Sequence, residues 1–285
     1  MTDFSKYKME FSEYANSTGL NASVLKRRAR SSWRHVQSDQ PRDSAEFALG
    51  RAVHCAVLEP LTLPARYGQL PSAEGIKTKT GKPAKNPETT SDYKELVEAQ
   101  RAANPQMDYL TKKQWENVMG MASAVRKSKK AQALLNGCEM ELSLHWDMPT
   151  LVAGAPGKIP CKTRPDALNL EASRPRLVEL KSTHDANPYV FTRQCRNLDY
   201  AMQLAFQSFG VLAEFQVQIR DFNIIAVEST FPWTVSIHEI TKATISDEEV
   251  RCIELIDEYA QLPDIGDWPG YGDEINVIDF SRGDA

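Results

Sequence analysis

The chain has 285 residues, of which 41% are apolar and 25% charged. This composition is that of a globular protein with room for one large domain or two small ones, and it excludes a disordered or fibrous protein. The longest charge-free apolar stretch, residues 200–213, has fourteen residues, whereas a membrane span needs roughly 18. The first residues lack the basic segment and apolar core of a secretory signal. We therefore expect a cytoplasmic protein without membrane association.

The net charge of −4 is distributed unevenly along the chain. Residues 245–285 hold twelve acidic and two basic side chains, so residues 1–244 carry a net charge of +6. The densest basic cluster lies between residues 14 and 38, a stretch that contains no acid. Its members are Lys26, Arg27, Arg28, Arg30 and Arg34. The positive body suits a polyanionic partner, although a solvated helix face explains the cluster equally well.

The five cysteines are spaced too widely for a CxxC pair or a zinc ribbon, since the closest two, Cys138 and Cys161, lie 23 positions apart. We expect reduced and mostly buried thiols. The count alone leaves an iron–sulfur cluster open, but the tight spacing usual for such clusters is missing.

Helical periodicity dominates residues 1–136. One helix is predicted after a cap at Asn21 or Ser23, and a second opens at the capping-box sequence 43–46 and ends before Pro60. The buried stripe of the second helix comprises Ala45, Leu49, Ala52, Val53, Ala56 and Val57. Residues 71–90 hold three prolines, four lysines and few apolar residues, which predicts an exposed basic loop. A helical pattern then resumes over residues 91–136 and is closed by Gly137.

After Gly137 the period changes to 2. Residues 139–148 alternate apolar and polar, which predicts one half-buried strand with Glu139 and Glu141 on its outer face. The further predicted elements are strands at 163–170 and 176–182 joined as a hairpin, a helix at 197–214, strands at 216–229 and 233–240, and an acidic helix from Ser246. This order predicts an α/β protein with one central mixed sheet. We expect one domain, 1–285, with a helical region over residues 1–136, a sheet core 137–243 and an acidic segment 244–285.

The predicted hairpin concentrates charged side chains. Glu179 and Lys181 share one face of their strand, while Val178 and Leu180 face the core. An antiparallel pairing centred between residues 172 and 173 places Asp166 opposite Glu179. An ordinary surface Glu/Lys pair is the competing interpretation, because the pattern E-x-K is common.

Two carboxylates about 4 Å apart repel each other by roughly 4 kcal/mol at an effective dielectric constant of 20. One lysine offsets only part of this repulsion. A divalent cation with oxygen ligands, Mg²⁺ first and Mn²⁺ as its substitute, would balance the pair. Such a site suits hydrolysis of a phosphodiester, with Lys181 holding or polarising the attacking water.

The sequence Pro165-Asp166, twelve further residues and then Glu179-Leu180-Lys181 resembles the PD-(D/E)XK nuclease signature. Several segments also look, in the same order, like the blocks of the exonuclease VIII (RecE-like) nuclease domain, which is akin to lambda-type exonuclease. These segments are residues 49–54, 58–60, 141–143, 161–166, 179–183 and 200–203. The resemblance implies a PD-(D/E)XK restriction-endonuclease-like core, with helices around a mixed sheet and a helical N-terminal region.

The resemblance also implies roles for individual residues. The implied metal ligands are His54, Asp166, Glu179 and the backbone carbonyl of Leu180. Lys181 would be the catalytic lysine, with Asp166, Glu179 and Gln203 completing the catalytic set. His54 lies one turn after Gly50 at the edge of the apolar stripe, where a buried core histidine is the alternative. Glu141 would approach the metal or DNA, or it is an ordinary surface glutamate.

One position departs from the family pattern Q-x-x-x-Y, because Gln207 stands where the tyrosine is usual. Gln207 still shares a helix face with Tyr200 and Gln203, and its role stays open. The candidate DNA-binding residues are Arg164, Arg28, Glu141, Ser182, Thr183 and Tyr200. The arginines are chosen because the guanidinium fork matches phosphate oxygens.

The resemblance implies a Mg²⁺-dependent exodeoxyribonuclease that degrades linear double-stranded DNA from its ends, 5′ to 3′, and leaves 3′ single strands for phage-type recombination. The implied assembly is a ring-shaped homo-oligomer, a trimer ahead of a tetramer, with a single-strand annealing protein as partner. The acidic segment would line an outer face or a subunit contact and repel DNA. The competing functions are an endonuclease of the same fold, an inactive DNA-binding module, and an α/β domain with solvated acids that binds no metal.

Overall fold

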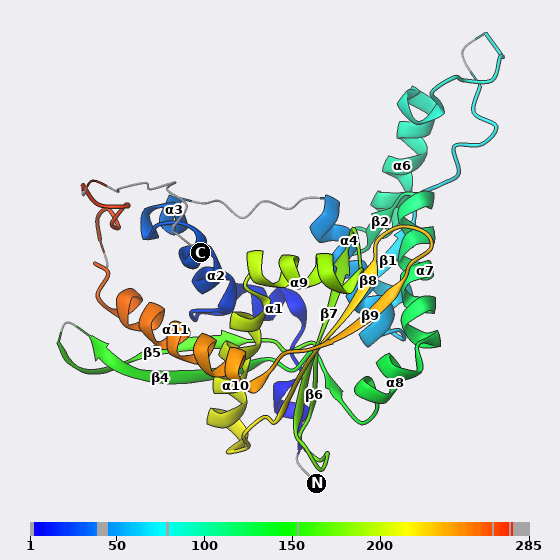
Figure 1. Cartoon of the computed structure of the whole chain (residues 1–285). Coiled ribbons are helices and arrows are strands. Elements are labelled where there is room, and N and C mark those ends of the chain that lie inside the picture. The colour runs from blue at the N-terminus through cyan, green and yellow to red at the C-terminus, as the bar shows by residue number, and fades with distance from the viewer. Residues whose placement is uncertain are drawn as a thin grey trace, which may run out of the picture.

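A mixed five-stranded sheet forms the centre of the molecule (Figure 1). The computed structural model describes residues 3–38, 45–77, 80–152, 154–263, 265–273 and 275. In spatial order the strands are β3 (Glu139–Met140), β6 (Ala167–Asn169), β7 (Arg176–Thr183), β8 (Asp221–Glu228) and β9 (Val235–Glu239). The pair β7 and β8 is parallel, and all other neighbours are antiparallel. The predicted α/β class with a central mixed sheet is confirmed.

Helices cover both faces of this sheet (Figure 1). One face carries α4 (Ala45–Leu58), α7 (Lys112–Lys127) and α8 (Lys129–Leu135), which pack on Val178 and Leu180 of β7. On the opposite side α10 (Tyr200–Phe215) packs on β7, and α2 (Ala22–Arg30) and α11 (Lys242–Ala260) pack on α10. Because successive strand residues point to opposite faces, burial on both sides leaves β7 and β8 with few exposed side chains.

A long hairpin of β4 (Leu144–Val152) and β5 (Ala155–Thr163) packs against α10 and α11. The single strand predicted over 139–148 is therefore wrong. The chain leaves β3 at Glu141, whose φ of 54° is left-handed, and it then pairs with β5 instead of β6. The alternation of side chains continues across this break and hides it. The strand β5 escaped prediction because Pro156, Gly157 and Pro160 lower its strand propensity.

The region predicted to be helical also contains a small parallel sheet of β1 (Tyr67–Gln69) and β2 (Asp108–Leu110). The remaining elements before the central sheet are η1 (Ser5–Tyr7), α1 (Phe11–Asn16), α3 (Trp33–Ser38), α5 (Leu63–Arg66), η2 (Pro87–Thr89) and α6 (Ser91–Ala103). A further helix, α9 (Pro188–Asn197), precedes α10 and was not predicted. The helix predicted from Ser246 begins earlier, at Lys242, because Thr241 caps it.

Several local predictions are confirmed. Asn21 caps α2 by accepting hydrogen bonds from Ser23 and Val24, and α4 ends two residues before Pro60. In α4 the predicted stripe residues Ala52, Val53 and Ala56 are fully buried, while Leu49 and Val57 are partly buried. Residues 43 and 44 of the predicted capping box and the side chains of residues 45 and 46 lie outside the described portion of the chain.

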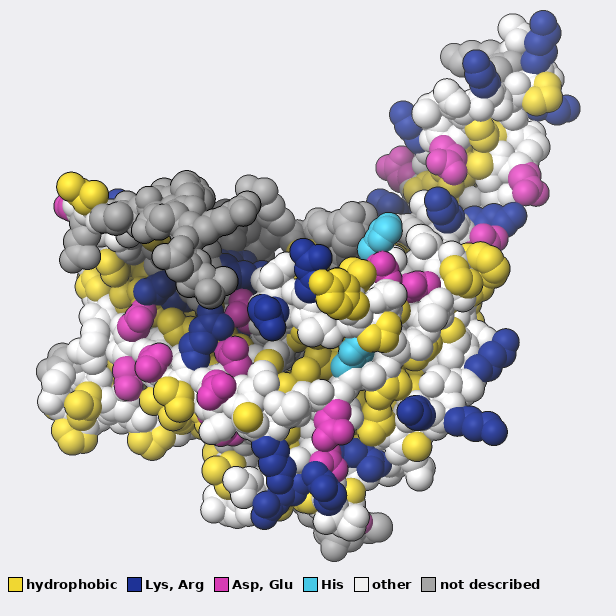
Figure 2. Space-filling model, in the orientation of Figure 1, with side chains coloured by type: hydrophobic (Ala, Val, Ile, Leu, Met, Phe, Trp, Pro, Cys, Tyr) yellow, Lys and Arg dark blue, Asp and Glu magenta, His cyan; other side chains and the backbone are white. Residues whose placement is uncertain are grey.

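The described residues of the basic loop, 71–77 and 80–90, form with α6 an arm that projects from the body (Figures 1 and 2). In the described portion of the loop Lys77, Lys82 and Lys85 are exposed, as predicted. In the acidic segment, residues 266–271, which follow α11, lie against α3. Trp268 contacts the Trp33 ring edge to face, with centroids 6.0 Å apart, and the Arg34 backbone N–H donates to the Pro269 carbonyl at 3.0 Å.

The five cysteines all belong to the described portion of the chain and are free thiols. Among the helices that the structure describes, none has both the length and the apolar character that a membrane span requires.

Gly210 provides a test of the contact between α10 and the hairpin. A Cβ at this position would meet the Trp146 ring at 2.8 Å, and that ring is itself packed on Phe206. We expect Gly210→Ala to lower the free energy of unfolding by about 1–2 kcal/mol. Overpacking costs about 1–3 kcal/mol, and the better helix propensity of alanine returns at most about 1 kcal/mol. Urea unfolding followed by circular dichroism measures the change.

Gly50 in α4 is the matched control, because among the described residues its Cβ would meet only Ser182 Oγ, at 3.9 Å. There we expect Gly50→Ala to raise the free energy of unfolding by about 0.5–1 kcal/mol. Equal effects at the two glycines would contradict the packing of α10 on Trp146.

Candidate active site

The pairing of β6 with β7 has the predicted register. Ala167 pairs with Val178 and Leu168 with Leu177, so Asp166, one residue before β6, comes level with Glu179. Both acids are buried, with 6% of Asp166 and 1% of Glu179 exposed. Burial of two neighbouring carboxylates is unfavourable unless each finds donors or a cation.

Glu179 is held by three donors. Lys181 Nζ lies 2.6 Å from Oε2 of Glu179, and the side-chain amides of Gln203 and Gln207 donate to Oε2 at 2.7 Å and to Oε1 at 2.5 Å. Burial and the negative charge of Asp166 raise the pKa of Glu179. Burial alone would lower the pKa of Lys181, but the charges of Glu179 and Asp166 raise it above its ordinary value. Lys181 therefore stays an ammonium group.

Asp166 has different partners. The Leu180 backbone N–H donates to its Oδ2 at 2.7 Å, and His54 Nδ1 lies 3.4 Å from its Oδ1. Burial opposes ionisation, but the charge and hydrogen bond of His54 outweigh it and lower the pKa of Asp166 to about 2. Asp166 is an ionised carboxylate at neutral pH.

Among the described residues, one group could hold a metal ion, and this candidate metal centre consists of His54, Glu141 and Asp166. Their ligand atoms all lie within 4.8 Å of one another. The left-handed turn between β3 and β4 brings Glu141 here, and its backbone N–H donates to the Asp166 carbonyl at 3.1 Å. Burial works against a proton on His54, but Asp166 and Glu141 raise its pKa to about 10. Two carboxylates and an imidazole suit a divalent cation, so this donor set fits a divalent metal.

The predicted ligand set only partly coincides with this group. His54 and Asp166 belong to it, whereas the Glu179 carboxylate is engaged by Lys181 and the two glutamines. The Leu180 peptide takes part through its N–H, and the role of its carbonyl stays a prediction. The sequence predicts for Glu141 a contact with the metal, a contact with DNA, or an ordinary surface position. The structure places Glu141 beside the predicted ligands His54 and Asp166.

Arg164 points inward instead of into solvent. Only 6% of its side chain is exposed, and its guanidinium donates to Glu141 Oε2 at 2.7 Å, Ser143 Oγ at 2.9 Å and the Met9 carbonyl at 2.6 Å. In this position it orients Glu141. Its predicted contact with phosphate stays a prediction.

The other candidate DNA-binding residues are dispersed. Ser182 and Tyr200 line the pocket at the site. Thr183 is buried and donates to Gln194 Oε1 at 2.8 Å. Arg28 pairs with Glu258 at 2.9 Å and lies outside the set of described residues that line the pocket.

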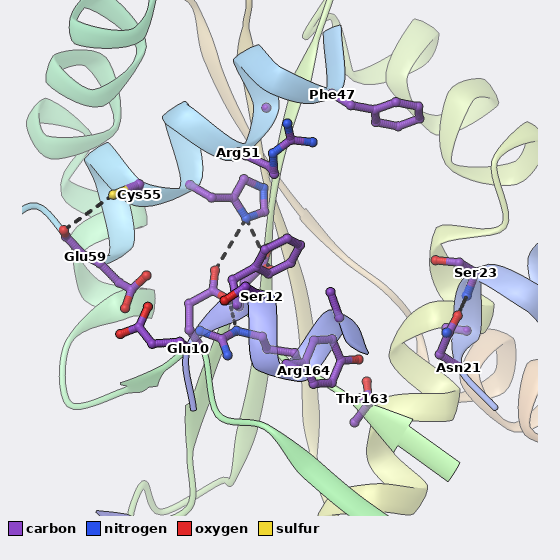
Figure 3. Close-up of a pocket in the computed structure, with 18 of the residues that line it drawn as sticks. Glu10, Ser12, Asn21, Ser23, Phe47, Arg51, Cys55, Glu59, Thr163 and Arg164 are labelled. Atoms are coloured by element: carbon purple, nitrogen blue, oxygen red, sulfur yellow. Dashed lines mark hydrogen bonds and ion pairs between the residues drawn. The ribbon is translucent and has the colours of Figure 1, made fainter. Parts of the chain in front are cut away.

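The pocket has a volume of about 890 Å³ and is bounded by α1, α2, α4, the end of β5, β7 and α10. Figure 3 shows Arg51 on α4 on one side, with Asn21 and Ser23 at the start of α2 on another. Lys26 reaches the same cavity from α2. Burial and the nearby charge of Lys181 lower the pKa of Lys26 to about 8. The sequence identifies Lys26 as a member of a basic cluster. That its side chain points into the pocket depends on how α2 packs on the rest of the protein.

The fold and the site define a PD-(D/E)XK-like protein. The family described as "PDDEXK-like domain of unknown function (DUF3799)" matches residues 22–280, and the chain belongs to it. This confirms the predicted superfamily. No curated protein matches the chain.

Solved structures include a similar fold. A protein described as "Putative exonuclease" from Eubacterium rectale is 12% identical, with a TM-score of 0.53 over 96% of both chains. At this identity the likeness concerns the fold alone. A second structure, described as SSO0001, is 15% identical over 82% of this chain and 85% of its own, with a TM-score of 0.28.

The titration of His54 tests the geometry of the candidate metal centre. In protein free of divalent metal we expect its imidazole to titrate near pH 10 instead of 6.5, because Asp166 and Glu141 stabilise the charged form. The stabilisation of the fold that accompanies this shift is complete below pH 6.5 and is lost as the pH rises through about 10. Nuclear magnetic resonance of the ring follows the titration, and Asp166→Asn should lower the midpoint.

His145 is an internal reference in the same spectra, because burial lowers its pKa. A His54 midpoint near 6.5 would show that the imidazole does not face the two carboxylates.

Proposed function

We propose that the chain is a divalent-metal-dependent deoxyribonuclease of the RecE-like or lambda-type class. It degrades linear double-stranded DNA from its ends in the 5′ to 3′ direction and leaves 3′ single strands for recombination by strand annealing. The observation that carries this proposal is that Asp166 and Lys181 line one pocket beside His54 and Glu141, with the buried Glu179 carboxylate 2.6 Å from the Lys181 ammonium. Family membership supports the fold in which such residues act, and the direction and end preference rest on the resemblance of the sequence blocks.

The proposed ligands of the cation are His54, Asp166, Glu179 and the Leu180 carbonyl, with Glu141 added to the set. When bound, a divalent cation supplies Lewis acidity toward water and the phosphate oxygens. The proton on His54 must leave before the imidazole serves as a ligand. Asp166 is already ionised, and Arg164 holds the Glu141 carboxylate in place.

Lys181 and Gln203 are the proposed substrate-side groups. The Lys181 ammonium lies between Glu179, at 2.6 Å, and the ring of Tyr200, whose centroid is 5.3 Å away. It therefore offers a fixed positive charge to the attacking water or to a phosphate oxygen. Gln203 positions the same carboxylate and faces the pocket.

The proposal extends to assembly and location. We propose that the chain forms a single nuclease domain and assembles into a ring-shaped homo-oligomer, with a trimer favoured over a tetramer. The proposed partner is a single-strand annealing protein, and the proposed location is the cytoplasm of a bacterial or phage-infected cell. The contrast between a basic body and an acidic C-terminal segment supports a polyanionic substrate.

The competing interpretation as solvated acids has little support, since Asp166 and Glu179 are buried. The two other candidates are an endonuclease of the same fold and an inactive DNA-binding module. An endonuclease would cut closed circular DNA, whereas an inactive module would bind DNA and leave both circles and linear ends intact.

The reaction is tested with purified protein, Mg²⁺, and linear and closed circular duplexes labelled at either terminus. We expect loss of the 5′ label first and intact circles. Lys181→Ala and Asp166→Ala should each lower the rate by at least about a hundredfold, because each removes a charge from the reacting centre. Lys181→Ala should retain DNA binding in a mobility-shift assay.

Lys158→Ala is the matched control, because Lys158 is an exposed lysine of β5 outside the pocket. Nicking of closed circles would indicate an endonuclease. DNA binding without cleavage of any substrate would indicate an inactive binding module.

Calorimetric titration tests the cation. We expect Mn²⁺ to bind more tightly than Mg²⁺, because magnesium prefers oxygen ligands and the set includes an imidazole. Asp166→Ala and Glu141→Gln should each weaken binding by at least about tenfold. Glu139→Gln is the control for Glu141→Gln. Glu139 lies two positions before Glu141 in the sequence and pairs with Lys8 at 3.1 Å. Unchanged affinity in Asp166→Ala would exclude this metal centre.

A further inference from the structure

We infer that Lys26 is a positioning residue, which holds the side-chain amide of Gln203 in the one orientation that lets it donate to Glu179. The inference rests on the proposed function, because its main consequence is a change in the rate of DNA hydrolysis. Lys26 belongs to none of the sequence blocks that carry the resemblance.

Three elements meet in a line of hydrogen bonds. Lys26 Nζ, from α2, donates to Gln203 Oε1 at 2.8 Å. Gln203 Nε2, on α10, donates in turn to Glu179 Oε2, on β7, at 2.7 Å. One amide thus connects an ammonium group to the carboxylate of the signature.

The chemistry of the three groups allows only this orientation. An ammonium group only donates hydrogen bonds, an ionised carboxylate only accepts them, and an amide has one end of each kind. Turning the Gln203 amide by 180° would set its oxygen against Glu179 and its NH₂ against Lys26. Both contacts would then be repulsive, so Lys26 and Glu179 together fix the amide, and Lys26 holds the end that Glu179 does not.

Gln207 provides a contrast on the same helix face. It donates to Glu179 Oε1 at 2.5 Å, but its own Oε1 is buried and finds no partner among the described residues. Glu179 alone therefore fixes which end of the Gln207 amide faces the carboxylate, and burial restricts the movement of this side chain, of which 1% is exposed. Gln203 borders the pocket and is less buried, so it depends on a charged partner to keep its amide in place.

Lys26 is itself held in position. Its ammonium group lies 5.6 Å from the centroid of the Tyr200 ring, within the range of a cation–π contact. The preceding residue, Leu25, is fully buried and anchors α2 on the core.

The consequence is a specific kinetic effect. Without Lys26 only the bond to Glu179 holds the Gln203 amide. The amide then moves more, Glu179 loses a donor for some of the time, and the contact between Glu179 and Lys181 changes. A hydrogen bond to a charged group contributes enough for its loss to slow the chemical step by about tenfold to a hundredfold. The affinity for DNA should change little, because the disturbed contact lies behind the carboxylate.

The experiment compares kcat and KM on linear duplex for wild type, Lys26→Met, Lys26→Arg, Gln203→Ala and the double variant Lys26→Met/Gln203→Ala. We expect Lys26→Met to lower kcat by about tenfold or more with KM within about twofold, and Lys26→Arg to restore most of the rate. In the Gln203→Ala background, Lys26→Met should add no further loss. Lys158→Met is the control for loss of one positive charge and should behave as wild type.

Resonances of the Gln203 side-chain NH₂ supply a readout that needs no activity. In the 285-residue chain labelled with ¹⁵N-glutamine they are assigned by their disappearance in Gln203→Ala. We expect Lys26→Met to shift and broaden them and Lys158→Met to leave them unchanged.

Three results would overturn the inference. The first is a rise in KM alone for Lys26→Met, which would indicate only a phosphate contact. The others are additive losses of rate in the double variant and unchanged Gln203 resonances in Lys26→Met. If the wild type leaves all DNA intact, the proposed function fails, and the Gln203 resonances then decide the contact by themselves.

Discussion

Two buried carboxylates, Asp166 and Glu179, impose the main constraint on this molecule. Neighbouring strands bring them level, and burial removes the water that would otherwise screen their repulsion. Each acid therefore needs partners supplied by the rest of the fold. A backbone N–H and His54 serve Asp166, whereas Lys181 and two glutamines of α10 serve Glu179. Helices on both faces of the sheet are needed to deliver these groups to one point.

The partners divide the site into two halves. Asp166 faces an imidazole and Glu141, which are groups that bind cations, while Glu179 faces ammonium and amide donors. In the proposed nuclease the first half supplies most of the metal ligands. In the second half Glu179 completes the ligand set, while Lys181 and Gln203 face water and phosphate. Arg164 and Lys26 act one layer further out, since each orients a residue of one half. Arg164 and Lys26 point into the protein instead of toward solvent because their partners, Glu141 and Gln203, lie there.

The elements were predictable where one local signal decides them. Asn21 begins α2 because its side chain accepts from two backbone N–H groups, and the stripe of α4 is buried because its period matches the helix. The strand at 139–148 was wrong because side-chain alternation carries no information about φ at Glu141. The hairpin strand β5 was missed because long-range pairing with β4 overrides the low propensity of its prolines and glycine.

The sequence by itself determined the register of Asp166 with Glu179 and the common face of Glu179 and Lys181. Both follow from local rules, a short hairpin and a period of two residues. Only the tertiary structure decided that Glu141, Gln207 and Lys26 join this site. These residues lie on segments far apart in the sequence, and their side chains converge because of the angles at which helices pack on the sheet and because of one left-handed residue. No local periodicity encodes those angles.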